Sequence, residues 1–234
     1  MNKKNFGKKS INFTHFIMIP FENETFLDSY NKLTEILISE NPKNFNKLLL
    51  QNPKKIHMTI CVLDLKNDNN LINKVIQILD ENINKIKEIC DNELIFNFDQ
   101  FNTFNSIEKT KVIFAKMLKD ENNYKLNKII NLIINEFILC GIIDKNNLNE
   151  YNIKIKNNSI YKIKKHITLL NISFLNQQLK KEKKTCEKFF DGEDILKVMK
   201  KIKLSECKLK KINFCKMSEE KDKIYEIIKS YNLY

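Results

Sequence analysis

The 234-residue sequence contains no arginine and no tryptophan, and only three glycines, three prolines and three histidines. All 41 basic residues are therefore lysines, and any phosphate contact has to use an ammonium, which lacks the planar donor fork of a guanidinium. The glycines, Gly7, Gly141 and Gly192, are too scattered to form a phosphate-cradling loop. The sequence therefore predicts neither a dinucleotide-binding fold nor a P-loop fold.

The six cysteines form no Cys-x-x-Cys pair, and no His–Cys or His–carboxylate cluster has metal-ligand spacing. We therefore expect reduced thiols, no metal and no cofactor. The first residues lack the apolar stretch of a signal peptide, and Asn2 argues against N-myristoylation. Residues 129–143 are the most apolar stretch, but Asn131, Asn135 and Glu136 interrupt it, which is typical of a buried helix rather than a membrane span. We expect a cytoplasmic or nuclear protein that does not contact membranes.

The formal net charge is +12. Such a charge is compatible with a basic surface that attracts a phosphate-bearing ligand. The alternative is a solvated surface on which lysine, like the abundant asparagine and isoleucine, has accumulated without a role. Composition alone does not separate the two.

Two distant stretches share one pattern, an apolar strand in which His and Thr are two positions apart. They are Ile56-His57-Met58-Thr59-Ile60 and Lys165-His166-Ile167-Thr168-Leu169. Because side chains alternate along a strand, the apolar residues face a core and each His shares the other face with its Thr. His15 has no such Thr, and we expect it to be structural. Two imidazoles and two hydroxyls are predicted to line one cleft.

These residue types suit phosphodiester cleavage. One imidazole takes a proton from the attacking oxygen and the other gives a proton to the leaving oxygen, at a pH near neutrality. Threonine hydroxyls donate hydrogen bonds to the non-bridging phosphate oxygens. The alternative is that each His and Thr is a polar residue on a sheet without a catalytic role.

Hydrophobic periodicity predicts helices at residues 23–40, 68–90, 122–140 and 193–203, and strands at 12–21, 94–98, 111–117, 208–217 and 223–230, besides the two motif strands. Residues 1–11 form a polar tail, residues 12–234 a single two-lobed domain, and residues 176–191 a lysine-rich insertion expected to be mobile. This order predicts an α+β fold with two small antiparallel sheets facing a central cleft and helices outside.

Together, His15 to Pro20, the first motif, Thr110 to Lys116, the second motif and Ile212 to Met217 resemble the 2H phosphoesterase superfamily. Within it they are most similar to the A-kinase anchor protein 7-like, or 2′,5′ RNA ligase-like, domain. The resemblance covers residues 12 to 230 and implies a pseudo-symmetric fold, with His57 and His166 as general acid and base and Thr59 and Thr168 as phosphate ligands. The family often has proline where this chain has Lys165.

Phe101 and Phe104 are placed in a loop between two strands, where they either stack on a nucleobase or cap the core. Tyr161 and Tyr225 are weaker candidates for the same role.

We therefore predict a metal-independent phosphodiesterase acting on a nucleotide or short oligonucleotide with a 2′,5′ or 2′,3′-cyclic linkage. The alternatives are a non-catalytic AMP-binding module and an RNA 3′-end processing enzyme, for which RNA is the partner. Anchoring of a kinase regulatory subunit is not predicted, because residues 224–229 are too short for the required helix and favour a strand.

Overall fold

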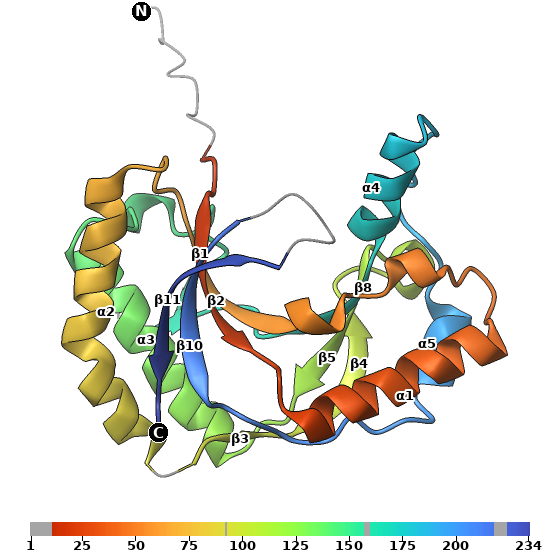
Figure 1. The fold of residues 1–234 in the computed structure, drawn as a ribbon, viewed down its shortest axis with the longest axis horizontal. Coiled ribbons are helices and arrows are strands. Elements are labelled where there is room, and N and C mark those ends of the chain that lie inside the picture. Colours follow the sequence, from red (N-terminus) through yellow and green to blue (C-terminus); the bar gives the residue numbers. More distant parts are fainter. Residues whose placement is uncertain (1–10, 92, 157–159, 218–223) are drawn as a thin grey trace, which may run out of the picture.

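The computed structural model describes residues 11–91, 93–156, 160–217 and 224–234 (Figure 1). Its helices are α1 Glu24–Glu40, α2 Asn69–Cys90, α3 Glu121–Leu139, α4 Ile172–Lys181 and α5 Glu193–Met199, with short 3₁₀ turns at Lys47–Leu49, Pro53–Lys55, Ile107–Lys109 and Lys145–Asn147. Its strands are β1 His15–Pro20, β2 His57–Leu63, β3 Ile95–Phe96, β4 Phe98–Thr103, β5 Val112–Met117, β6 Lys154–Lys156, β7 Ile160–Lys162, β8 Ile167–Asn171, β9 Cys207–Lys208, β10 Lys211–Lys216 and β11 Glu226–Asn232.

The strands form two main antiparallel sheets. One has four strands in the order β11-β10-β1-β2, and the other has three in the order β4-β5-β8. Two short ladders, β3-β9 and β6-β7, complete the strand pairing of the described residues. Each motif strand, β2 and β8, thus lies at the edge of its own sheet. The predicted α+β class with two antiparallel sheets is confirmed, while the pseudo-symmetry of the two lobes stays a prediction.

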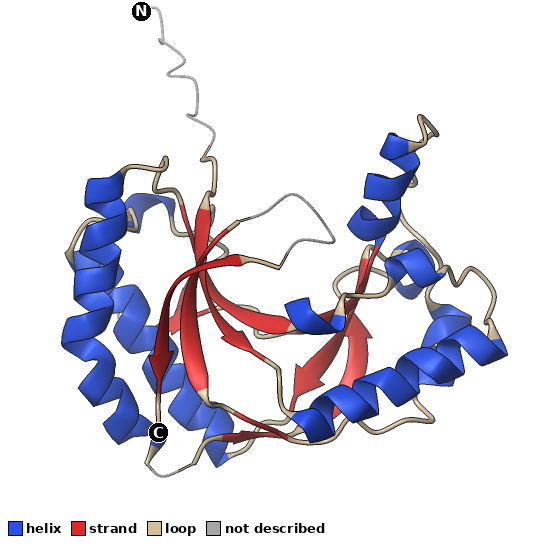
Figure 2. Cartoon of the chain, viewed as in Figure 1, coloured by secondary structure: helices blue, strands red, loops and turns tan. Residues whose placement is uncertain are grey.

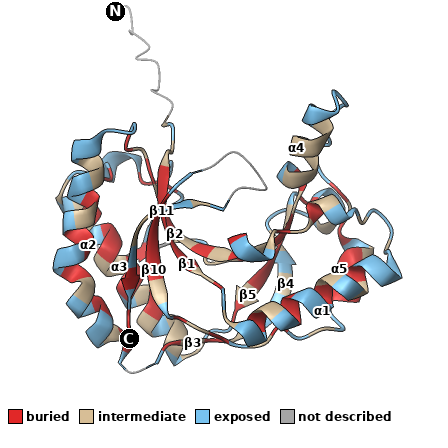
Figure 3. Ribbon diagram, viewed as in Figure 1, coloured by how far each residue is buried: buried red, intermediate tan, exposed pale blue. Residues whose placement is uncertain are grey.

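The helices lie outside the sheets, as Figures 1 and 2 show. Helices α2 and α3 lie against each other beside the four-stranded sheet, and α1 and α5 lie together beside the three-stranded one. Buried side chains from both sheets and these helices form one continuous hydrophobic cluster. Figure 3 colours the buried residues of these elements red along the ribbon. A smaller cluster of Phe16, Met18 and Cys215 lies apart from it. In β1, therefore, Ile17 and Ile19 face the main core while Phe16 and Met18 face the other side of the sheet.

Two elements differ from the sequence predictions. Strand β4 continues to Thr103, so Phe101 lies in a strand and not in the following loop. Helix α4 covers the start of the segment predicted as a mobile insertion. The Asn171 side chain caps this helix at the Ser173 N–H, and the Asn176 side chain holds the backbone of Glu187. These local hydrogen bonds from amide side chains hold the segment in a defined conformation. Hydrophobic periodicity does not predict such bonds.

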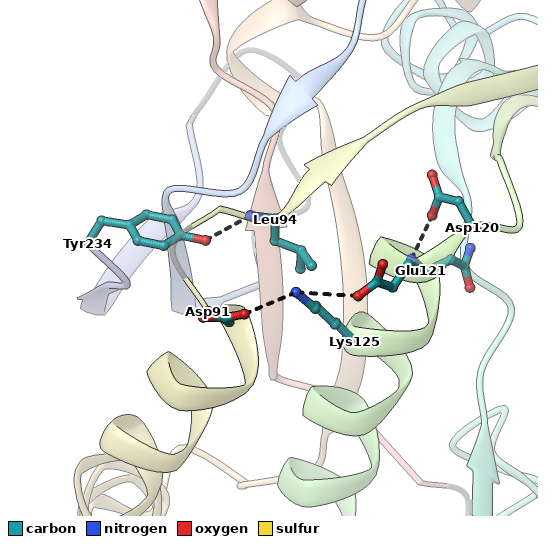
Figure 4. A network of polar contacts seen from close by, with 7 residues as sticks. Asp91, Leu94, Asp120, Glu121, Lys125 and Tyr234 are labelled. Atoms are coloured by element: carbon teal, nitrogen blue, oxygen red, sulfur yellow. Dashed lines mark hydrogen bonds and ion pairs between the residues drawn. The ribbon is translucent and has the colours of Figure 1, made fainter.

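Polar contacts lie close together where the carboxyl end of the chain meets the ends of α2 and α3 (Figure 4). The Lys125 ammonium lies 3.7 Å from Asp91 at the end of α2 and 3.8 Å from Glu121 at the start of α3. The Leu94 N–H donates to the Tyr234 hydroxyl at 2.9 Å. Exposed ion pairs of this kind contribute little free energy, so packing of α2 against α3 dominates here.

Gly141, predicted to end the third helix, has a left-handed backbone with φ of 72° directly after α3. A Cβ at this position would meet no atom within 4 Å, so Gly141→Ala tests backbone conformation alone. We expect this change to lower the free energy of unfolding by about 1–2 kcal/mol, because an L-residue pays that cost in the left-handed region. Chemical denaturation measures it, and a loss below about 0.3 kcal/mol would contradict the assignment. Gly192→Ala is the contrasting variant, since its Cβ would lie 3.1 Å from Thr110 Cγ2.

Candidate active site

The two motif histidines are held by the same hydrogen bond. His57 Nδ1 lies 2.7 Å from the carbonyl oxygen of Lys55, and His166 Nδ1 lies 2.7 Å from that of Lys164. A carbonyl oxygen only accepts, so Nδ1 carries the proton in both rings. In the neutral imidazole Nε2 is then an unprotonated acceptor, and in the imidazolium it is a donor. Both rings are thus arranged to exchange a proton at Nε2.

Strand alternation places the motif residues as the sequence predicts. Met58 and Ile60 of β2 are buried, whereas His57 and Thr59 between them are half-buried. In β8, Ile167 is buried and Thr168 is half-buried.

Tertiary contacts bring the two motif strands together. The Gln51 N–H, ahead of β2, donates to the Leu169 carbonyl in β8 at 2.8 Å. The buried Tyr30 hydroxyl of α1 donates to the Gln51 carbonyl at 2.8 Å. The edges of the two sheets therefore adjoin, and the charge of His166 acts on His57.

Each imidazole lies against two aromatic rings. The His57 ring centroid is 5.4 Å from that of Phe16 and 5.3 Å from that of Tyr225. The His166 centroid is 4.8 Å from that of Phe104 and 5.7 Å from that of Phe114. Beside each histidine the two aromatic rings also touch each other. These contacts restrict the orientation of both imidazoles.

Two hollows of about 420 and 340 Å³ adjoin at Thr59, which lines both. The first contains His57 with Phe16 and Tyr225, and the second contains His166 with Phe104. Thr59 thus borders the hollow of each imidazole. Thr168 lines neither hollow among the described residues.

Burial lowers the pKa of both histidines. For His57 the pKa falls to about 4, mainly through desolvation and secondarily through the positive charges of His166 and Lys55, although the bond to the Lys55 carbonyl opposes the shift. The pKa of His166 is lowered mainly by desolvation and also by the charge of Lys164, and the hydrogen bond to the Lys164 carbonyl again opposes the shift. Both rings are therefore neutral at pH 7 in the absence of ligand.

The other candidates occupy different places. His15 is 1 % exposed and its Nδ1 is 2.8 Å from the Thr14 hydroxyl, so it lines neither hollow. Phe101 lines a separate hollow with Lys200 to Leu204 and contacts the main core, away from both histidines. Tyr161 is buried. Of the predicted aromatic candidates, Phe104 and Tyr225 are the two that the structure brings to the imidazoles.

A family model described as the AKAP7 2'5' RNA ligase-like domain matches residues 13–233. The chain belongs to this family. The resemblance noted from the motifs is thereby confirmed. No curated protein matches the chain.

Solved structures similar to this AKAP7-like domain share its fold across nearly all of both chains. The Escherichia coli LigT structure, titled as a complex with 3'-AMP, has a TM-score of 0.54 at 11% identity, covering 94% of this chain and 97% of that chain. TT0787 of Thermus thermophilus gives 0.55 at 11% identity with the same coverage. A structure titled as a phosphoesterase gives 0.52 at 10% identity, covering 94% and 98%. Identities this low establish the fold alone.

Within the described parts of the domain, no three His, Cys, Asp or Glu side chains are grouped to hold a metal ion. Nor does any helix in those parts have the length and apolarity needed to cross a membrane.

Phe16 and Phe114 also contact the imidazoles and were not predicted from the sequence. Both precede their motif strand in the chain and belong to the strand paired with it, β1 or β5. An aromatic residue on the strand paired with each motif is the signal that points to them.

Proposed function

We propose that this protein is a phosphodiesterase for nucleotides or oligonucleotides carrying a 2′,5′ or 2′,3′-cyclic linkage, with His57 and His166 as general acid and base. The observation that supports it best is the repeated Nδ1–carbonyl bond, which leaves Nε2 of both rings for proton transfer. Membership of the AKAP7 2'5' RNA ligase-like family supports the same class of reaction.

The proposed reaction is an in-line displacement at phosphorus. Nε2 of one neutral imidazole removes the proton of the attacking water or ribose hydroxyl while the new P–O bond forms. Nε2 of the other, protonated imidazole donates its proton to the departing ester oxygen as the old P–O bond breaks. The two rings end in exchanged protonation states, and proton exchange with solvent restores them.

Thr59 is proposed as the main hydroxyl donor to a non-bridging phosphate oxygen, because it lines both hollows. Thr59→Val removes this donor while keeping a β-branched strand residue, and we expect it to lower kcat about 10–100-fold. Thr59→Ser should restore most of the rate. Steady-state kinetics on the preferred substrate measures both, and equal rates for the valine and wild-type proteins would contradict the role. Thr168→Val is expected to have the smaller effect.

The half-exposed Phe104, 39 % exposed beside His166, is proposed as the nucleobase contact. A nucleotide ligand is in keeping with the similar LigT structure, whose title names 3'-AMP. We also propose that residues 12–234 act as one domain, since a single core joins both sheets.

Longer RNA is a second candidate substrate, favoured by one observation. A hollow of about 540 Å³ shares Ile163 with the hollow of His166, and its charged lining consists of Lys116, Lys119, Lys165 and one acid, Asp120. Cations in this position suit the phosphates of a polymer that extends past the site.

The deciding experiment is product formation from 2′,5′-linked oligoadenylate, from 2′,3′-cyclic nucleotides and from a longer RNA, each with EDTA present. The substrate that is cleaved identifies the linkage. Binding to the longer RNA that weakens steeply as the salt concentration rises would favour the polymeric substrate. Binding of AMP without cleavage of any substrate would contradict the enzyme and favour a nucleotide-binding module.

A further inference from the structure

Each motif begins two residues before its histidine, with a lysine. The chain reads Lys55-Ile56-His57-Met58-Thr59 in one copy and Lys164-Lys165-His166-Ile167-Thr168 in the other. The carbonyl of each lysine accepts the Nδ1 hydrogen bond of its histidine. The shared unit is therefore Lys-x-His-x-Thr, and the backbone of its lysine already has a defined role.

The two lysine side chains make matching aromatic contacts, although Lys55 is buried and lines neither hollow while Lys164 is exposed and lines that of His166. The Lys55 ammonium lies 4.3 Å from the ring centroid of Tyr225, and that ring contacts His57. The Lys164 ammonium lies 5.0 Å from the ring centroid of Phe104, and that ring contacts His166. An aromatic face attracts a cation and holds it in place. In both copies one aromatic ring thus lies against both the ammonium and the imidazole.

The surroundings of the site are positive. Lys216 lines the hollow of His57 and Lys164 lines that of His166, whereas no Asp or Glu of the described residues lines either one. The groups that act on the His57 charge are Lys55 and His166, and Lys164 acts on His166. The Tyr225 phenol beside His57 is neutral, because burial raises its pKa to about 12. In a chain without arginine, Lys55 and Lys164 are thus the motif lysines whose charges act on the two imidazoles.

We propose that Lys55 and Lys164 are positioning and recognition residues of the site, whose ammonium groups attract the anionic phosphate of the substrate toward the two imidazoles. When the phosphate arrives, its negative charge offsets the ammonium charge and stabilises an imidazolium. One imidazole then takes up the proton that it donates in the reaction. This inference rests on the proposed function of His57 and His166.

The test uses charge-removing variants and the titration of the imidazoles. Lys55→Met and Lys164→Met should each weaken binding of inorganic phosphate and of AMP about tenfold, since a charge-assisted contact is lost. The titration midpoint of the adjacent imidazole, followed by NMR of its ring protons, should rise in each variant without ligand. Lys164→Arg keeps the charge and should retain binding. Lys54→Met is the matched control, because Lys54 is exposed and precedes Lys55 directly.

The outcomes separate the two proposals. If phosphate and AMP move neither the His57 nor the His166 signals of the wild-type protein, the proposed active site itself is overturned. If the wild-type signals respond but Lys164→Met binds and titrates like the wild type, only the role of the lysines is overturned. Lys164 is exposed, so this variant is expected to fold even if replacement of Lys55, 6 % exposed, destabilises the protein.

Discussion

His57→Ala and His166→Ala are each expected to lower kcat on the cleaved linkage about 10³-fold, because either change removes one of the two proton-transfer steps. The reaction needs both a base for the attacking oxygen and an acid for the leaving oxygen, and the chain has no third imidazole in the hollows that the described residues line. The double variant should be little slower than either single one, since the two groups act as a unit. Single-turnover rates with EDTA present measure the effect.

His15→Asn is the matched control for these variants. His15 is buried, lines neither hollow and is expected to affect turnover by no more than a few-fold. Circular dichroism and thermal unfolding should show that the alanine variants keep the fold, because both motif side chains lie on the cleft side of their strands. Turnover that survives in both single variants would refute the two-histidine mechanism.

The pH dependence of kcat/KM is expected to be a bell with its maximum below pH 6.5. The reaction requires one neutral and one protonated imidazole. The fraction of protein molecules in this protonation state is largest between the two pKa values. Desolvation lowers the pKa of His57 to about 4 and that of His166 below its usual value of 6.5. Above the higher pKa both rings are neutral and the acid is lost. At pH 8 the value should therefore be about 30-fold or more below the maximum, because each pH unit past that pKa removes a factor of ten.

The profile of kcat provides the internal check. A bound phosphate anion stabilises an imidazolium, so the alkaline limb of kcat should lie at higher pH than that of kcat/KM. Rates from about pH 4 to about pH 9 at constant ionic strength measure both limbs. A kcat/KM maximum above about pH 7.5 would contradict the assignment of two desolvated histidines as acid and base.

Much of the fold could be predicted because the spacing of hydrophobic residues indicates which face of a helix or strand is buried. The helix predicted at 68–90 is α2 at Asn69–Cys90, and the alternation around His57 is the burial pattern of β2. The prediction was least accurate where local polar hydrogen bonds decide. Asn171 caps α4 and Asn176 ties Glu187 to it, and neither contact alters the apolar period.

The amino-acid sequence specifies which side chains the two motifs contain and which face of each strand they share. Each motif contains a His and a Thr two positions apart. Because side chains alternate along a strand, the two lie on the same face of that strand in any fold that keeps it extended. Which groups surround each imidazole depends instead on how the sheets assemble. Tyr225 reaches His57 through the pairing of β11, β10, β1 and β2, and Phe104 reaches His166 through β4, β5 and β8. Such contacts join residues as far apart in the chain as Tyr225 and His57, and they depend on strand order and register, which local sequence patterns do not encode.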